Sequence, residues 1–409
     1  MKEISRRTVL GGLPTALSIA ALGAAATAAP QPAGKLKITK LNYYKATLTY
    51  DMLFIEMHTD GGIVGIGEGT CHGRCDVVEA AIRWLEPYLI GYDPSGVEEN
   101  WNRLLYGYTR WSSGIIPRTA LSAIDMALWD IMGKRLGMPV WRLMGGGSLQ
   151  KPLRAYYTHW NSGLRNDPAA YAERAIETVK NGWTAVKFSP PAGGTESDRM
   201  ANLTAILAAM RKAVGAKLDI GLEFSESLNK RTAVSMARAV EPYSPFFIEE
   251  PLPRENLPEF SELAAKTSVP IATGEGQLSR YEFRPLLETN GVAIVQPDVA
   301  KCGGITEIRK IANFAEVYGV QVAPHQCYGP IAHVASLASM AACRNFLIQE
   351  WEGVNDEAFQ RVCKGTYPVQ KNGVITLPER AGLGIEVDFA EFEKRHPFTN
   401  LGSKAKIRS

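Results

Sequence analysis

The sequence predicts an α/β protein whose main domain is a (β/α)8 barrel of the TIM type, preceded by a smaller α+β domain. After the glycine triplet 145–147, short apolar strands alternate strictly with amphipathic helices, a pattern typical of parallel βα units. Eight consecutive units close naturally into a barrel. A doubly wound open sheet is the alternative, but it would usually carry a Gly-rich phosphate-binding turn, and the sequence has none. The predicted strands are 153–158, 185–189, 219–225, 246–250, 270–275, 294–299, 320–325 and 346–351.

The region before the barrel reads as a small sheet followed by helices. Alternating apolar residues predict antiparallel strands at 38–48, 53–57 and 63–67. Residues 76–144 then show helical periodicity. The predicted domain boundaries are 36–150 for the N-terminal domain, 151–352 for the barrel and 353–409 for a C-terminal segment.

The first 29 residues have the three parts of an export signal. Arg6 and Arg7 precede an apolar Gly/Ala/Leu run, which ends in the cleavage-like triplet Ala26-Thr27-Ala28. Paired arginines favour the twin-arginine route. A membrane anchor is the alternative, but this run is short and rich in Gly and Ala, whereas a spanning helix needs about 20 strongly apolar residues. We therefore expect a cleaved signal peptide at 1–29, a periplasmic mature protein and no membrane association after cleavage.

Composition limits the class of partner. The 409 residues are 45% hydrophobic and 21% charged with a net charge of +3, which is ordinary for a globular enzyme. No basic stripe suggests a nucleic-acid partner. The cysteines show no paired zinc-type spacing, so free or buried thiols are expected. They are Cys71, Cys75, Cys302, Cys327, Cys343 and Cys363.

Three predicted strands in succession end in a glutamate. Glu223, Glu249 and Glu275 are each 26 residues apart, one βα unit, so we expect their carboxylates at the same level of the barrel mouth. A single one of them would be unremarkable as a solvated strand end or an ion-pair partner. Three carboxylates in one pocket repel, and a hard divalent cation with oxygen ligands relieves that repulsion. The sequence therefore predicts one Mg²⁺ ion per active site, bound by these three residues.

The remaining strand ends supply groups for proton transfer. Asp298 ends strand six and His325 ends strand seven, and an aspartate beside a histidine makes a general base. Glu350, on strand eight, is a candidate for binding a developing oxyanion or orienting the substrate. Lys187, on strand two, is expected to act as a countercharge or electrostatic aid more than as a proton carrier. Together these groups predict removal of a proton α to a carboxylate, with stabilisation of the resulting ene-diolate.

With these residues in place, the sequence resembles the enolase superfamily, its mandelate racemase branch and, within that, acid-sugar dehydratases similar to galactonate dehydratase. The resemblance covers nearly all of residues 36–390. Its motifs are Asp60–Glu68, Ala123–Lys134 with Met144–Gly146, Ile248–Pro251, Gly274–Glu275, Gln296–Asp298 with Gly303–Glu307, Ala323–His325 with Gly329–Ile331, and Gly382–Glu386.

The resemblance implies that the N-terminal domain, together with the C-terminal segment, is a capping domain over the barrel mouth that selects the substrate. It assigns Mg²⁺ to the three glutamates, the base to the His/Asp pair, and a homo-oligomer to the assembly. His72 and Arg74 fall in the family's specificity loop, although they could be simple surface residues. The expected substrate contacts are Ser189, Ser225, His72, Arg74, Tyr328 and Trp351.

The sequence departs from the family pattern at two strands. Strand two has Ser189 where racemases of this branch carry a second lysine, which argues against two-base racemisation. Strand three has Ser225 where galactonate dehydratase-like enzymes carry a histidine acid. One base on one face suggests that His325 removes the α proton and returns it to the leaving group in a syn elimination. His72 or Tyr328 could instead be the acid.

The predicted function is that of a Mg²⁺-dependent lyase that dehydrates an aldonic or uronic-type sugar acid. An epimerase, or a cycloisomerase of an anhydro-sugar acid or lactone, would use the same enolisation. A non-catalytic periplasmic sugar-acid binder is the alternative from another class, but a binder needs no base. Export makes a substrate larger or more modified than a simple aldonate plausible, and the short segment 48–53 between the first two strands predicts an open pocket.

Overall fold

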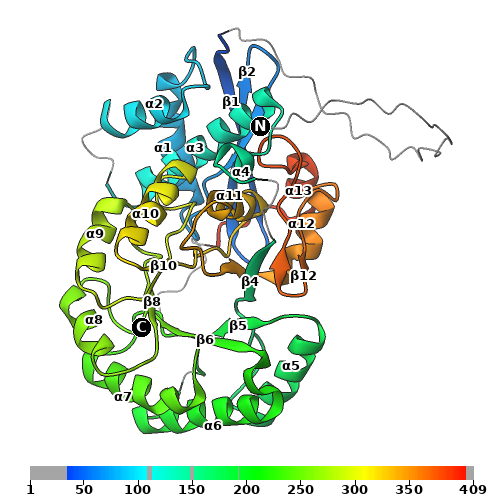
Figure 1. Ribbon diagram of the computed structural model, residues 1–409. Coiled ribbons are helices and arrows are strands. Elements are labelled where there is room, and N and C mark those ends of the chain that lie inside the picture. The colour runs from blue at the N-terminus through cyan, green and yellow to red at the C-terminus, as the bar shows by residue number, and fades with distance from the viewer. Residues whose placement is uncertain (1–34, 108–112, 148–151, 192, 402–409) are drawn as a thin grey trace, which may run out of the picture.

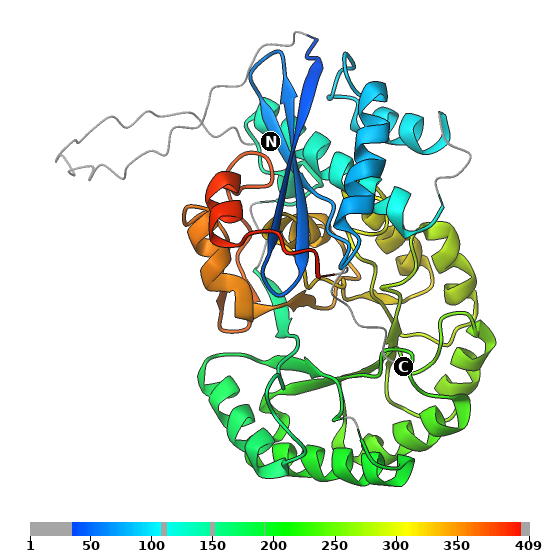
Figure 2. The same cartoon turned by 180° about the vertical axis from the view of Figure 1, so that it is seen from behind.

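The computed structural model describes residues 35–107, 113–147, 152–191 and 193–401. The predicted signal peptide lies outside these ranges. A ring of helices surrounds the barrel strands, and a smaller sheet-and-helix domain stands above one side of the ring (Figures 1 and 2). The predicted fold class, a (β/α)8 barrel with an α+β N-terminal domain, is confirmed.

All eight predicted barrel strands are present and lie side by side in chain order. They are β4 (Leu153–Tyr157), β5 (Ala185–Phe188), β6 (Asp219–Glu223), β7 (Phe247–Glu249), β8 (Ile271–Thr273), β9 (Ile294–Val295), β10 (Gln321–Val322) and β11 (Gln349–Trp351). A parallel bridge between Val322 and Phe346 and the pairing of β11 with β4 close the ring. Most strands are shorter than predicted because their last residues leave the sheet at the barrel mouth. Ser225 and Glu250 show this, with left-handed φ angles of 47° and 41°.

A helix follows each strand and packs outside the ring (Figure 1). These helices are α5 (Pro168–Lys180), α6 (Glu196–Val214), α7 (Lys230–Val240), α8 (Leu257–Ala264), α9 (Arg280–Glu288), α10 (Ile305–Val317), α11 (Pro330–Met340) and α12 (Asp356–Val362). Four of them begin after a polar residue whose side chain accepts a hydrogen bond from the first turn, which fixes where the helix starts. These N-cap residues are Asp167, Thr195, Asn229 and Ser279.

The N-terminal domain is a three-stranded antiparallel sheet packed against helices. Its elements are β1 (Ile38–Thr47), β2 (Asp51–Thr59), β3 (Val64–Glu68), α1 (Cys75–Leu85), α2 (Val97–Asn102), a π-helical turn at Arg103–Gly107, α3 (Ile115–Leu136) and α4 (Val140–Leu143). Gly65 and Gly67 allow β3 to lie directly on α3. A Cβ atom at either position would overlap the carbonyl oxygens of Ala127 and Ala123. These two glycines therefore set the distance between the sheet and its longest helix.

The C-terminal segment returns to both domains. Its hairpin of β12 (Gln370–Lys371) and β13 (Val374–Ile375) pairs antiparallel with β4 of the barrel. Its helix α13 (Phe389–Arg395) packs on the N-terminal sheet, where the rings of Phe389 and Tyr44 stack at 4.6 Å. The same segment therefore ties the sheet of the first domain to the barrel.

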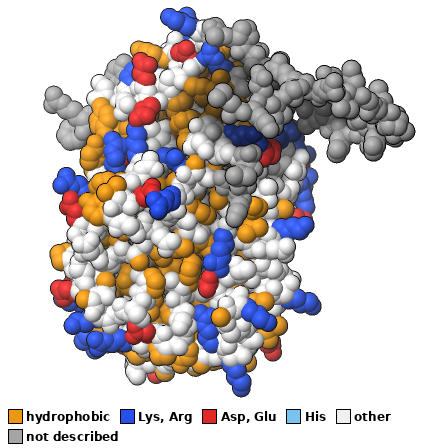
Figure 3. Space-filling model, in the orientation of Figure 1, with side chains coloured by type: hydrophobic (Ala, Val, Ile, Leu, Met, Phe, Trp, Pro, Cys, Tyr) orange, Lys and Arg blue, Asp and Glu red, His pale blue; other side chains and the backbone are white. Residues whose placement is uncertain are grey.

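The described surface mixes side chains of different kinds, and the thiols are unpaired. Basic, acidic and apolar side chains are interspersed on the face seen in Figure 3. Among the described residues, no helix combines the length and apolar character needed to cross a bilayer. All six cysteines are unpaired and five of them are buried, as the sequence predicts.

Candidate active site

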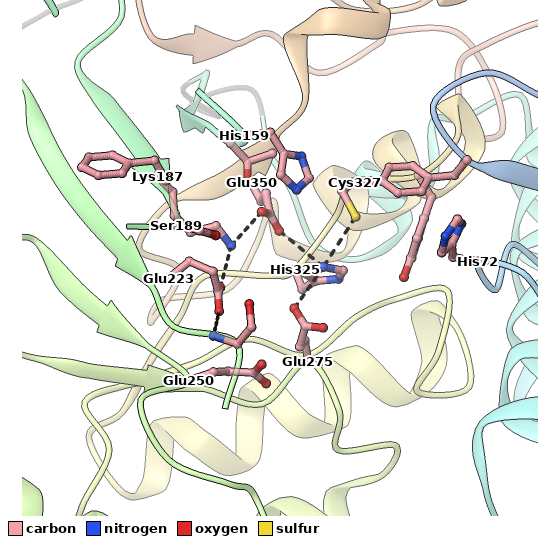
Figure 4. Close-up of a pocket in the computed structure, with 15 residues that line it drawn as sticks. His72, His159, Lys187, Ser189, Glu223, Glu250, Glu275, His325, Cys327 and Glu350 are labelled. Atoms are coloured by element: carbon pink, nitrogen blue, oxygen red, sulfur yellow. Dashed lines mark hydrogen bonds and ion pairs between the residues drawn. The ribbon is translucent and has the colours of Figure 1, made fainter. Parts of the chain in front are cut away.

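A cavity of about 290 Å³ opens where the C-terminal ends of the barrel strands face the N-terminal domain. Strand ends supply most of its wall, and two residues of the N-terminal domain complete it (Figure 4). The lining residues are Tyr50, His72, Thr158, His159, Lys187, Phe188, Ser189, Glu223, Ser225, Glu250, Glu275, His325, Cys327, Tyr328 and Glu350. Five of the predicted strand-end residues therefore meet at one place, whereas Glu249 and Asp298 do not line the cavity.

Lys187, on β5, lies in the middle of the carboxylates. Its Nζ is 2.5 Å from an oxygen of Glu249, 2.9 Å from one of Glu350 and 3.5 Å from one of Glu223. Burial alone would lower the pKa of Lys187, but Glu249 and Glu350 raise it well above its ordinary value. The ammonium group is therefore charged and balances part of the negative charge of the site.

His325 and Asp298 form the predicted pair, joined by a parallel bridge between their backbones. The His325 Nδ1 lies 2.8 Å from an Asp298 carboxylate oxygen. Burial favours a higher pKa for Asp298, but Lys301 and His325 lower it, so the carboxylate accepts and Nδ1 is the donor. The Nε2 atom is left facing the cavity, 3.2 Å from Glu275 and 3.6 Å from the sulfur of Cys327 (Figure 4). His325 is thus held in one orientation, with Nε2 at the cavity beside Glu275.

Glu350, on β11, lies between the lysine and the histidine. One of its oxygens is 2.9 Å from Lys187, and the other accepts a hydrogen bond of 2.8 Å from the Gln326 backbone. Burial would raise the pKa of Glu350, but Lys187 and His325 lower it below its usual range. An ionised carboxylate can only accept hydrogen bonds, so this arrangement suits orientation of a substrate hydroxyl better than donation to an oxyanion.

The three predicted metal ligands do not all face the cavity. Glu223 and Glu275 line it, whereas Glu249 is buried behind the wall, between Lys187 and the amide of Gln296 at 2.5 Å. Glu250, which the sequence analysis did not include, lines the cavity instead. Among the described residues, no three acidic, histidine or cysteine side chains converge in an arrangement that would hold a metal ion.

The donor chemistry nevertheless suits a hard cation. Glu223 and Glu249 are direct neighbours across β6 and β7. Burial and the adjacent Glu223 carboxylate raise the pKa of Glu249 well above its ordinary value. Burial and Glu275 raise the pKa of Glu250 to about 8, and its Oε1 is buried with no hydrogen-bond partner in the described part of the chain. This concentration of oxygen donors is what a divalent cation would relieve.

The predicted substrate contacts divide into two groups. Ser189, Ser225, His72 and Tyr328 line the cavity. Arg74 and Trp351 do not.

The positions of the last two residues explain this difference. Arg74 is exposed at the start of α1, and its guanidinium reaches back to the His72 carbonyl. Trp351 is fully buried, because successive strand side chains point to opposite faces and its neighbour Glu350 is the one that faces the cavity. The predicted contact roles of Arg74 and Trp351 are therefore not supported by their positions.

Sequence reasoning missed several residues of the site. Tyr50 comes from the turn between β1 and β2, where its ring lies 5.0 Å from His72 and 6.1 Å from Tyr328. His159 follows β4, and Lys301 lies 3.3 Å from Asp298. Lys301 could have been found, since it stands three residues after Asp298 on a turn. Tyr50 gave no local signal, because only the docking of the domains brings it to the barrel.

Two carboxylates of the N-terminal domain cap the barrel helices that follow the His/Asp pair. Asp125, on α3, accepts hydrogen bonds from the backbone and hydroxyl of Thr306 at the start of α10, at 3.0 and 2.6 Å. Glu68, at the end of β3, accepts from the backbone of Gly329 and Ala332 at the start of α11, at 2.7 and 2.9 Å. The domain interface thereby fixes the helices directly behind the predicted base.

Comparison with known proteins identifies the family. A profile described as the enolase C-terminal domain-like family matches residues 170–391, and the mandelate racemase / muconate lactonizing enzyme N-terminal domain matches residues 43–145. The chain belongs to the enolase superfamily. Members of this superfamily typically use Mg²⁺.

Solved structures of superfamily members agree over most of the chain. A protein from Salmonella enterica serovar Typhimurium named "putative dehydratase" is 32% identical with a TM-score of 0.82, covering 89% of this chain and 99% of its own. A protein of the same description from Mesorhizobium loti is 30% identical with a TM-score of 0.80, covering 88% and 98%. A mandelate racemase/muconate lactonizing enzyme-like protein from Roseovarius sp. TM1035 is 30% identical with a TM-score of 0.81, covering 89% and 96%. This chain is therefore an enolase-superfamily enzyme, and its substrate is a separate question.

Proposed function

We propose that this enolase-superfamily enzyme is a Mg²⁺-dependent sugar-acid dehydratase. The observation that carries the proposal is that, among the described residues that line the cavity, there is one oriented base, His325, and no second lysine opposite it. Ser189 occupies the place of that lysine in the cavity wall. A single base suits removal of a proton followed by loss of a hydroxyl, whereas racemisation needs a proton donor on the opposite face. Two similar structures are named "putative dehydratase", which supports a dehydratase rather than a racemase.

The reaction begins at the α carbon of the bound acid. The Nε2 of His325 takes the α proton, and the C–H electron pair moves toward the carboxylate to give an ene-diolate. Asp298 keeps the imidazole oriented through Nδ1, and Lys187 places a positive charge beside the developing negative charge. These residues therefore lower the activation free energy for removal of the α proton.

The second step breaks the bond between the β carbon and its hydroxyl. The electron pair leaves with oxygen, and the proton on the His325 imidazolium moves to that oxygen, so that water departs. The remaining enol becomes a 2-keto-3-deoxy acid. Tyr328 and His72 also line the cavity and are the alternative donors.

Glu223, Glu249 and Glu275 are the residues that would hold Mg²⁺, with Glu250 beside them. When bound, Mg²⁺ supplies a Lewis acid that stabilises charge on the substrate carboxylate. Two pairs of neighbouring carboxylates support this donor set, Glu223 with Glu249 and Glu250 with Glu275. In each pair, burial and the neighbouring carboxylate raise the pKa of one member, and a bound cation would relieve this repulsion.

The proposal is tested by incubating the mature protein with Mg²⁺ and a library of aldonic, aldaric and uronic acids in deuterated water. A 2-keto-3-deoxy product is the expected result. Deuterium exchange at the α carbon without that product would replace the dehydratase by an epimerase or cycloisomerase. No exchange with any acid that binds would favour a non-catalytic binder.

The matched variants are His325→Asn and His58→Asn. His325→Asn should abolish both product and α-proton exchange, because Asn has no basic nitrogen. His58 lies on the N-terminal sheet with Glu56 and Asn42 as partners, so the same change there should leave turnover intact. Exchange that persists in His325→Asn would assign the base to another residue.

A further inference from the structure

The active-site cavity does not end at the catalytic residues. A second cavity of about 440 Å³ shares Tyr50, Thr158, His159 and Ser189 with it. A third, of about 420 Å³, shares His159, Tyr157 and Val354 with the second. Ligand pockets usually begin near about 300 Å³, so the 290 Å³ active-site cavity alone suits one small acid. We call the second and third cavities together the distal groove. It adjoins the active-site cavity and leads away from the base.

His159 stands where all three cavities meet. Its backbone is left-handed, with φ of 50°, a conformation that a non-glycine residue adopts at a cost and that recurs at binding sites. Its ring Nδ1 lies 3.1 Å from the buried carboxylate of Glu352, while half of the side chain is exposed. The residue is therefore held in place where the active-site cavity adjoins the other two, and Figure 4 shows it among the residues that line the active-site cavity.

The wall of the distal groove combines aromatic and uncharged polar groups. Tyr157 and Trp183 stack at 5.3 Å between ring centres, and both line the third cavity. Ser162 and Asn181 add hydrogen-bonding side chains, while the Asn161 amide nitrogen already donates to Tyr171 and to the Ser189 carbonyl. Such a mixture suits a ring that has apolar C–H faces and hydroxyl edges.

The charges of the groove argue against a second anionic group. Arg174 and Glu177 line the same cavity and carry opposite charges. The Arg174 guanidinium already donates to the backbone carbonyls of Trp160 and Ser162, at 3.0 and 2.8 Å. A phosphate or carboxylate site would present a less occupied cation. The groove is therefore suited to a neutral, polyhydroxylated ring.

The turn between β1 and β2 borders this groove. It consists of residues 48–50, and Thr49 and Tyr50 line the second cavity. Because Tyr50 also lines the active-site cavity, the turn stands where the two cavities adjoin.

We propose that the distal groove binds a neutral sugar ring attached to the far end of the acid, so that the substrate is a glycosylated sugar acid rather than a simple one. The inference rests on the proposed dehydratase function for the acid end of that substrate. The carboxylate and α carbon lie at His325 and Lys187, and the attached ring passes His159 to reach Tyr157 and Trp183.

The first test compares gluconate with its 4-O-glycosylated forms, cellobionate, maltobionate and lactobionate. We expect kcat/KM for at least one glycosylated acid to exceed that of gluconate by about tenfold or more, the size of one good ring contact. Val354 is 64% exposed and lines the groove but not the active-site cavity. The change Val354→Trp should fill the groove and reduce the ratio of kcat/KM for the glycosylated acid to that for gluconate by about tenfold. The change Trp183→Ala should also lower this ratio. Trp84→Ala is the control, because Trp84 lies on the exposed face of α1.

A second measurement separates this inference from the proposed function. The neutral disaccharides cellobiose, maltose and lactose carry no carboxylate, so their binding by titration calorimetry does not depend on the proposed reaction. We expect weak binding of at least one of them in the wild type and its loss in Val354→Trp. If gluconate is the better substrate and Val354→Trp leaves the ratio unchanged, the inference is wrong. If no acid reacts, the dehydratase proposal fails, and absence of disaccharide binding then overturns the groove as well.

Discussion

Buried carboxylates gather in two regions of this molecule and are held in different ways. At the barrel mouth, Glu350 and Glu249 face the ammonium of Lys187, and Glu275 faces His325. At the domain interface, Glu68 and Asp125 instead face backbone N–H groups at the starts of helices.

The difference appears in the pKa directions. His325 and Lys301 hold the pKa of Glu275 below its ordinary value in spite of burial. Burial raises the pKa of both Glu68 and Asp125 to about 7, because neutral hydrogen-bond donors offset it only in part. At the barrel mouth, nearby cations keep Glu275 and Glu350 ionised, although burial and neighbouring carboxylates raise the pKa of Glu249 and of Glu250. At the interface, Glu68 and Asp125 cap helices. The cations that could stabilise an anionic intermediate therefore belong to the first region, and structural capping to the second.

Removing Lys187 is expected to give the largest effect and tests the first half of this comparison. Lys187→Met leaves Glu223, Glu249 and Glu350 without their shared cation, which should destabilise the fold by about 3–5 kcal/mol. Loss of charge stabilisation should also lower kcat by about 10²–10³-fold. Thermal unfolding and steady-state rates measure both, with exposed Lys212→Met as the control. Unchanged stability would mean that the carboxylates do not depend on this lysine.

Metal removal comes next and rests on the proposed Mg²⁺ site. Saturating Mg²⁺ at about one hundred times its Kd should stabilise the protein by about 2.7 kcal/mol over an EDTA-treated sample. Glu249→Gln should eliminate that difference, while Glu357→Gln, on the exposed side of α12, should keep it. Differential scanning fluorimetry reads out the shift. If Glu250→Gln rather than Glu249→Gln removes it, the ligand is the glutamate that lines the cavity.

The smallest expected effect concerns Asp125 and depends on pH. Its pKa is raised from 3.8 to about 7, so the folded state binds a proton that the unfolded state releases. The stabilisation from this group is complete below about pH 4 and is lost as pH rises to about 7.

Asp125→Asn should remove that dependence while keeping a hydrogen bond to Thr306. The variant should match the wild type near pH 4 and exceed its stability by a growing margin as the pH rises to 8. Asp125→Ala, which loses the cap, should be less stable than Asp125→Asn by about 1–2 kcal/mol at both ends of this range. Urea unfolding across this range decides the matter, and an unaltered pH slope in Asp125→Asn would contradict the shift.

Much of the fold could be predicted because its signals are local. The order of all eight strands follows from apolar runs separated by helical periods, and the strand-end rule brings Glu223, Glu275 and His325 to one cavity. The rule did not say which side chains turn inward. Glu249 lies behind the wall and Glu250 on it, because the chain turns left-handed at residue 250.

Other parts depend on contacts between distant segments. Tyr50 reaches the cavity only because α3 and β3 dock on the barrel through Asp125 and Glu68. The groove beyond His159 likewise needs the β1–β2 turn, β4 and the segment after β11 to meet. No pattern within a single stretch of sequence predicts such contacts between distant segments.

The helix α13 also has a consequence for synthesis on the ribosome. It covers the N-terminal sheet, where Phe392 packs at 5.3 Å from Phe54. These two residues are separated by most of the chain, so on the order of 300 residues must be made at about 5–20 per second before the cover arrives. During those tens of seconds an aromatic face of the first domain to emerge stays open to solvent. The nascent protein is therefore expected to need a chaperone on that face until α13 is released.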